Sequence, residues 1–113
     1  MVLQKGKQMK KFLTARGNGW ALIVPKDVIK LLGIIPETAK LKFEIKGGIL
    51  FVQEVSSNNV DIEKYLIRRF TRKNTSWTLY MPNSIIELLK IKPEEDMVEL
   101  EVDGQMLIIK KVM

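Results

Sequence analysis

The sequence predicts a mostly β protein with short helices, built from one structural unit that occurs twice. The first observation is an internal repeat: the 113-residue chain aligns with itself, without a gap, at the 57-residue offset that separates Trp20 from Trp77. The second is that each copy contains a short apolar stretch closed by a proline, which is typical of a strand. The third is an alternating pattern around a glycine turn late in each copy, which predicts a hairpin.

Fourteen residues are identical between the copies at this offset, and both tryptophans and all four prolines are among them. Over about 45 aligned positions, ordinary residue usage would match roughly three. The pairs are Thr14/Thr71, Trp20/Trp77, Leu22/Leu79, Pro25/Pro82, Ile29/Ile86, Leu31/Leu88, Leu32/Leu89, Ile34/Ile91, Pro36/Pro93, Glu37/Glu94, Glu44/Glu101, Gly47/Gly104, Leu50/Leu107 and Val55/Val112. We therefore interpret residues 10–55 as repeat 1 and 67–113 as repeat 2, with a disordered basic tail over 1–9 and a linker over 56–66.

Each repeat is expected to begin with a basic strand, KKFLTAR at 10–16 and IRRFTRK at 67–73. A polar corner follows, and then a short apolar strand, WALIV at 20–24 or WTLYM at 77–81, that ends at a proline. A unit of about 45 residues buries too little surface to fold well alone. Each repeat is therefore expected to pack against the other.

A short helix is expected after each proline. The first begins at Lys26 or Asp27 and ends at Gly33 in a left-handed cap, and the second begins at Ser84 with Glu87 completing a capping box. Because two helical turns do not persist alone, their apolar residues must be packed. These are Val28, Ile29, Leu31, Leu32, Ile85, Ile86, Leu88 and Leu89.

The hairpin strands LKFEI at 41–45 and VELEV at 98–102 alternate strictly, whereas the returning strands at 49–52 and 106–109 are wholly apolar. The returning strands are therefore expected to be buried on both faces. The outward side chains of the alternating strands are mainly basic in repeat 1 and mainly acidic in repeat 2. They are Lys40, Lys42, Glu44 and Lys46 against Met97, Glu99, Glu101 and Asp103. Either these two faces meet and attract each other, or both are solvated.

Composition excludes several classes of function. The chain has no cysteine and no histidine, which removes disulfides, thiolate zinc sites and imidazole acid–base chemistry. Its apolar runs of about five residues are far shorter than a membrane span, and the start lacks the apolar core of a secretion signal. We expect a cytoplasmic protein that is not an enzyme, with no cofactor, metal site or membrane association.

The net charge of +6 arises wholly in the first half of the chain. Residues 1–57 contain ten Lys or Arg against four acids, and residues 58–113 contain nine against nine. Basic residues recur beside the same corner of both repeats: Lys10, Lys11, Arg16, Arg68, Arg69, Arg72 and Lys73. They can contact nucleic-acid phosphates, or they can form a solvated strand face that discourages aggregation.

The order of a basic strand, a glycine corner, an apolar strand ending in proline, a short helix and a glycine-turned hairpin resembles the AbrB/MazE-type (SpoVT-AbrB) swapped-hairpin domain. In repeat 1 the match is carried by Gly17, Asn18, Gly19, Ala21, Val24, Pro25, Leu31, Leu32, Gly33 and Ile34. Repeat 2 keeps Ser76, Pro82, Leu88, Leu89, Ile91 and Pro93. It departs from the family pattern at Asn74 and Thr75, where the family favours glycine and asparagine.

The resemblance implies a swapped-hairpin β-barrel formed by two units, here a pseudo-dimer in which repeats 1 and 2 pair within one chain, with further homo-oligomerisation left open. It also implies sequence-specific binding of double-stranded DNA by a transcriptional regulator. The residues it assigns to DNA binding are Lys10, Lys11, Arg16, Asn18, Arg68, Arg69, Arg72 and Lys73. Family members often carry arginine two residues before the proline, where this chain has Ile23 and Tyr80, so recognition is expected to shift to Arg16 and Arg72.

The sequence leaves alternatives to this function open. An antitoxin with the same fold would also bind a toxin partner, which we do not favour, and a protein-interaction or oligomerisation module would bind no nucleic acid. Asn18 can contact DNA or hold the corner in left-handed geometry. Trp20 and Trp77 can seal the core or stack on DNA, and their alternation with core positions favours the first role.

Overall fold

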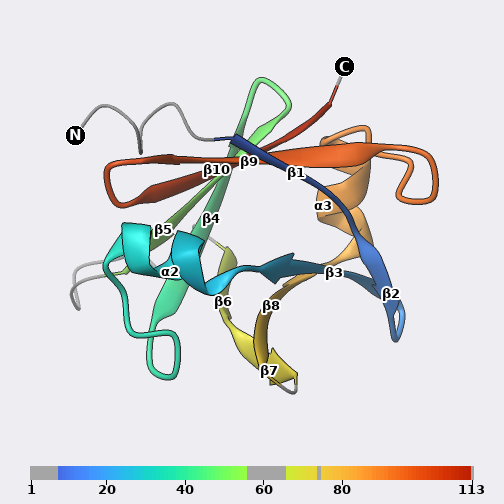
Figure 1. Ribbon diagram of the computed structural model, residues 1–113. Helices are drawn as coiled ribbons and strands as arrows, with labels where there is room; N and C mark the ends of the chain where they lie inside the picture. The colour runs from blue at the N-terminus through green and yellow to red at the C-terminus, as the bar shows by residue number, and fades with distance from the viewer. Residues whose placement is uncertain (1–7, 56–65, 74, 113) are drawn as a thin grey trace.

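The computed structural model describes residues 8–55, 66–73 and 75–112. Residues 1–7 of the predicted tail and 56–65 of the predicted linker lie outside the described residues. Residues 8 and 9, predicted to be disordered, belong to a strand instead, and residue 66, predicted to be linker, begins another. Within the described residues the chain is mostly β with two short helices, which confirms this part of the predicted fold class (Figure 1). The strands form two antiparallel sheets, one of six strands and one of four.

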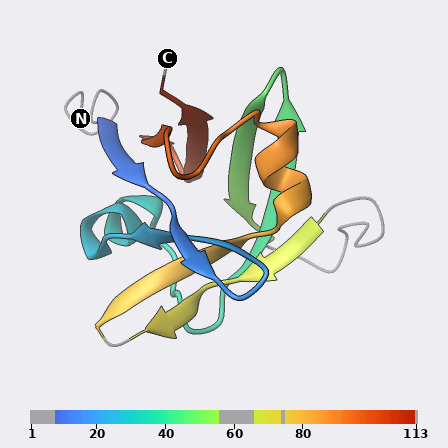
Figure 2. The same cartoon turned by 90° about the vertical axis from the view of Figure 1, so that its right-hand side faces the viewer.

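The six-stranded sheet has the order β1-β9-β10-β5-β4-β6. Its strands are β1 (Gln8–Phe12), β9 (Met97–Asp103), β10 (Met106–Lys111), β5 (Ile49–Glu54), β4 (Lys40–Lys46) and β6 (Leu66–Arg69). The four-stranded sheet has the order β2-β3-β8-β7. Its strands are β2 (Thr14–Arg16), β3 (Gly19–Val24), β8 (Ser76–Met81) and β7 (Thr71–Lys73). Helices α2 (Lys26–Leu32) and α3 (Asn83–Leu88) follow β3 and β8 and lie on opposite sides of the molecule (Figure 2).

The strand registers relate the two halves of the chain by a pseudo-twofold axis. β3 pairs with β8 so that Leu22 lies opposite Leu79, and β5 pairs with β10 so that Phe51 lies opposite Ile108. Both pairs are separated by the 57-residue repeat offset, so each ladder is centred on equivalent positions. The outer pairings are exchanged in the same way, because β1 of the first half pairs with β9 of the second and β6 of the second half pairs with β4 of the first.

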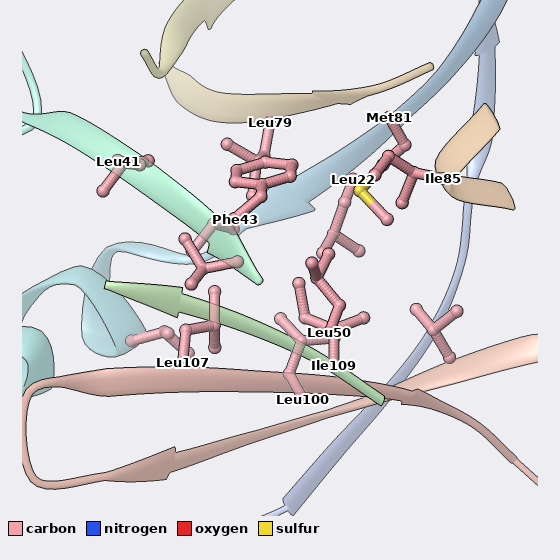
Figure 3. Packing of buried hydrophobic residues seen from close by; sticks show 14 of the residues in the cluster. Leu22, Leu41, Phe43, Leu50, Leu79, Met81, Ile85, Leu100, Leu107 and Ile109 are labelled. Atoms are coloured by element: carbon pink, nitrogen blue, oxygen red, sulfur yellow. The ribbon is translucent and has the colours of Figure 1, made fainter. Parts of the chain in front are cut away.

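The core lies between the two sheets and contains equivalent residues from both halves (Figure 3). Leu22 and Leu79 from the small sheet, and Leu50 and Leu107 from the large one, are fully buried. The predicted first strand of each half is interrupted, at Leu13 and at Phe70, because these equivalent residues turn into the core as the chain passes from one sheet to the other. This interruption lets one segment contribute a strand to each sheet.

Both helices follow their prolines as predicted, but their ends differ from the prediction. Gly33 ends α2 in the left-handed conformation, which confirms the predicted cap. Ser84 does not cap α3: Pro82 occupies the N-cap position and no side chain donates or accepts a capping hydrogen bond, so the predicted capping box is wrong. Most of the predicted apolar residues are packed, but Leu88 is exposed because it lies on the solvent side of α3.

Three further expectations are corrected or only partly met. Neither sheet closes on itself, so a barrel in the closed sense is not formed by the described strands. The returning strands are buried on one face only, because Phe51 and Ile108 point away from the core and remain partly exposed. The oppositely charged faces of β4 and β9 do not meet, since β5 and β10 lie between these strands.

Candidate nucleic-acid interface

The segments that build the four-stranded sheet contain no acidic residue. No Asp or Glu occurs in residues 1–26 or 64–86, and all thirteen acids lie elsewhere in the chain. Strands β2, β3, β7 and β8 therefore carry only neutral and basic side chains. A surface with one sign of charge attracts polyanions over several ångströms before any contact is made.

The outer face of this sheet is defined by strand alternation. Leu22, Val24, Leu79 and Met81 point into the core, so the residues between them point outward. A hollow of about 290 Å³ opens on this face. It is lined by Thr14, Ala15, Arg16, Ala21, Ile23, Thr75, Ser76 and Thr78. Residues of both halves thus share one concave, mixed polar and apolar surface, which we call the small-sheet surface.

Thr78 connects the two halves on this surface. The Arg16 guanidinium donates a hydrogen bond from Nη1 to Thr78 Oγ1 at 3.2 Å. The same hydroxyl donates to the Thr71 carbonyl oxygen at 3.0 Å, and Thr78 is only 3% exposed. Because a guanidinium has five N–H donors, one bond orients Arg16 and leaves most of its donor capacity for an anion.

Arg72 is held differently, at the edge of the same sheet. Its guanidinium carbon lies 5.8 Å from the centroid of the Trp77 ring, within the range of a cation–π interaction. Trp77 in turn packs edge-on against Phe70, with ring centroids 6.5 Å apart. Both Trp20 and Trp77 pack against the core cluster, which supports the structural role for the tryptophans.

The corner between β2 and β3 is tied to the second half of the chain. The Asn83 side chain donates from Nδ2 to the Asn18 carbonyl oxygen at 2.8 Å. Left-handed geometry at this corner belongs to Gly17 (φ 58°) and not to Asn18, which corrects one of the two roles expected for Asn18. Gly19 is needed for a different reason, because the Tyr80 ring occupies the space that a Cβ at position 19 would fill.

The eight predicted DNA-binding residues do not form one cluster. Arg16, Asn18 and Arg72 belong to the four-stranded sheet and its corner, as does Lys73, whose side chain lies outside what the structure describes. Lys10 and Arg69 lie on the large sheet, where their register partners are Glu99 and Lys40.

Lys11 and Arg68 occupy equivalent positions on the edge strands of the large sheet, where they pair with the buried residues Val98 and Leu41. They therefore lie on the inward-facing side of the large sheet. Arg68 Nε is buried without a hydrogen-bond partner among the described residues. These two residues are placed beside the core and away from the small-sheet surface.

Three residues that shape the small-sheet surface were not predicted. Thr78 lies in a stretch, WTLYM, that reads as an apolar strand, and no local pattern indicates that its hydroxyl bridges two halves of the chain. Tyr80 and Asn83 contact the β2–β3 corner only because β3 and β8 are neighbours. The 57-residue alignment could have indicated Tyr80, since it stands where the first half has Ile23.

Searches for similar proteins found no match among protein-family models, curated proteins or solved structures. Among the described residues, neither helix has the length and apolar character needed to cross a membrane.

Proposed function

We propose that this chain binds double-stranded DNA through the small-sheet surface and its two corners, and that it acts as a sequence-specific transcriptional regulator. The observation that carries the proposal is the acid-free, pseudo-twofold sheet, with Arg16 on its outer face and Arg72 exposed at its edge beside Trp77. The exchange of β1 and β6 between the halves also supports assignment to the swapped-hairpin class that the sequence resembles.

The spacing of the two corners suits a duplex. If the β3–β8 register is continued by one residue beyond Val24 and Trp77, Ser76 lies level with Pro25. Pro25 is six residues from Gly19, which corresponds to about 20 Å along the strands. The major groove of B-DNA is about 12 Å wide. Corners spaced in this way can contact the phosphates on both sides of the groove while the sheet between them faces the bases.

The two halves of this surface are not alike. Repeat 1 contributes Ala15 where repeat 2 has Arg72, and Ile23 where repeat 2 has Tyr80. The hollow of about 290 Å³ lies beside Ala15 and Ile23, whereas Tyr80 covers the equivalent space over Gly19. We therefore expect the preferred DNA site to be non-palindromic, although the protein backbone is pseudo-symmetric.

The test is a binding titration on mixed-sequence duplex DNA at two salt concentrations. Affinity should fall with a log–log slope of about −0.9 per phosphate contacted. Arg16→Glu and Arg72→Glu should each weaken binding at least tenfold, because each replaces a phosphate contact with a repulsive charge. Lys30→Glu, with the same charge change on the exposed side of α2, serves as the matched control.

No binding at low salt would refute the proposal. Equal losses from Lys30→Glu and from the two arginine variants would show that net charge alone attracts the DNA, and would refute the assignment to the small-sheet surface.

A further inference from the structure

The outer face of the large sheet has an apolar centre. In β5 and β10, Leu50 and Leu107 are fully buried, whereas the alternating residues Phe51 and Ile108 point the other way and are partly exposed. Phe51 and Ile108 lie opposite each other on the pseudo-twofold axis. We call this face the central patch, and its residues are Ile49, Phe51, Met106 and Ile108.

None of the four patch residues belongs to the core cluster of the described chain, although Ile49, at the rim of the patch, lines a hollow with Leu89 and Lys90 at the end of α3. The buried face of β5 and β10 contacts the core, and both helices and the four-stranded sheet lie on that side of β9 and β10 (Figure 1). An antiparallel sheet with one face on the core normally shows polar residues on the other. Aliphatic and aromatic residues at the centre of such a face mark a surface that associates with another.

Strands of opposite charge border the central patch. The order β9-β10-β5-β4 places β9 along one side and β4 along the other. The outward residues of β9 after Met97 are Glu99, Glu101 and Asp103. Those of β4 are Lys40, Lys42, Glu44 and Lys46. One border is therefore acidic and the other is predominantly basic, and the chain itself does not bring them together.

We propose that two copies of this chain associate face to face through the central patch. A twofold axis that runs along the strands, between β5 and β10, places the acidic β9 of each copy over the basic β4 of the other. The same rotation stacks the two apolar patches. The pairing is self-complementary, since each copy supplies one acidic and one basic border.

Two ion pairs within each copy lie at these borders. Lys46 contacts Glu44 at 3.5 Å, but its side chain is 70% exposed, so the pair is held weakly in water. Lys110 contacts Glu99 at 3.9 Å and partly neutralises the acidic border, while Asp103 at the β9–β10 turn is exposed. The middle of each border is the exception to charge complementarity, because Glu44 of one copy would face Glu101 of the other and both are acidic.

The proposed dimer does not rest on DNA binding. The small-sheet surface lies on the opposite side of the core from the central patch, so each surface can be occupied or mutated without the other (Figure 1). A dimer would present two small-sheet surfaces that face away from each other.

The first experiment is a light-scattering mass measurement on the intact chain at increasing concentration. We expect a particle of twice the 13.0 kDa chain mass. Ile108→Glu should reduce it to a single chain, because the substitution places charge at the centre of the patch. Ile35→Glu is the matched control, since Ile35 is 66% exposed on the loop after α2 and should leave the dimer intact.

Circular dichroism of each variant confirms that the fold is retained. A single-chain mass at about 100 µM, where specific association is normally visible, would overturn the proposal. So would a dimer that persists in folded Ile108→Glu.

A charge exchange provides the second experiment. Lys42 and Lys46 occupy the positions equivalent to Glu99 and Asp103, so the variants K42E/K46D and E99K/D103K introduce only residues that the other repeat already carries at those sites. Each variant alone should be a single chain, because like charges then face each other. An equimolar mixture should restore the dimer, since each partner then offers the complementary border.

Two folded variants that each remain dimeric, or that fail to associate when mixed, would overturn the proposal. Arg72→Glu should leave the mass of the particle unchanged, which separates a failure of dimerisation from a failure of DNA binding.

Discussion

Gly19 allows the Tyr80 ring to cross β3, and replacing it tests the asymmetry of the small-sheet surface. We consider Gly19→Ser, which introduces the residue that Ser76 provides at the equivalent position of repeat 2. A Cβ at position 19 would lie 2.7 Å from Cζ and 2.9 Å from Cε1 of Tyr80. Comfortable carbon–carbon contacts are about 3.5–4.0 Å, so the ring must retreat by roughly 0.6–1.3 Å.

The cost follows from how far the ring can move. Overpacking of a well-packed site costs about 1–3 kcal/mol. Because Tyr80 is partly exposed, its ring can relax toward solvent. We expect Gly19→Ser to lower the free energy of unfolding by about 1–2 kcal/mol, in the lower half of that range.

The assay is a double-mutant cycle measured by chemical denaturation. Tyr80→Ile introduces the residue that Ile23 provides in repeat 1, so the double variant G19S/Y80I reproduces the Ser76 and Ile23 combination already present in the other half. The Gly19→Ser loss should therefore nearly vanish in the Tyr80→Ile background, giving a coupling of about 1–2 kcal/mol. The same loss in both backgrounds would refute the steric explanation.

Three other predictions follow from the geometry. Thr78→Val should lower the free energy of unfolding by about 1–3 kcal/mol, because it removes the hydroxyl that accepts from Arg16 and donates to Thr71. It should also weaken DNA binding. Thr78→Ser should retain most of the stability and of the affinity, as measured by denaturation and by a binding titration. Leu22→Ala and Leu79→Ala should each cost about 3–5 kcal/mol by denaturation, and a cost below 1 kcal/mol for either would contradict the core placement. Lys90 has a φ of 58° and stands where the first repeat has Gly33. Lys90→Gly should therefore raise the melting temperature by relieving about 1 kcal/mol of backbone strain. A lowered melting temperature would contradict this.

The repeat itself could be recognised from the sequence, because Trp20 and Trp77 share one offset with thirteen other identities. The helices after the prolines and the Gly33 cap followed from local backbone chemistry. The failed capping box at Ser84 shows the limit of such reasoning, since Pro82 and the packing of Ile85 and Ile86 start the helix earlier. Local patterns predicted the element types better than their ends.

The candidate site was less accessible to sequence reasoning. Basic residues beside the corner were evident, but strand alternation and the break at Leu13 and Phe70 distribute them over two sheets. Thr78 was not recognisable, because its role depends on Arg16, which is 62 residues away in the chain. Contacts at that separation exist only when β3 and β8 are paired.

The sequence by itself determined that the chain is a duplicated β unit and that basic residues recur at the same place in both copies. These properties are local or periodic, so residue types and spacing suffice to reveal them. Only the tertiary structure decided which strands pair across the repeats, which basic residues share a surface, and that Phe51 and Ile108 are left partly exposed. Those outcomes depend on register and on the exchange of β1 and β6, which long-range packing selects and no single segment encodes.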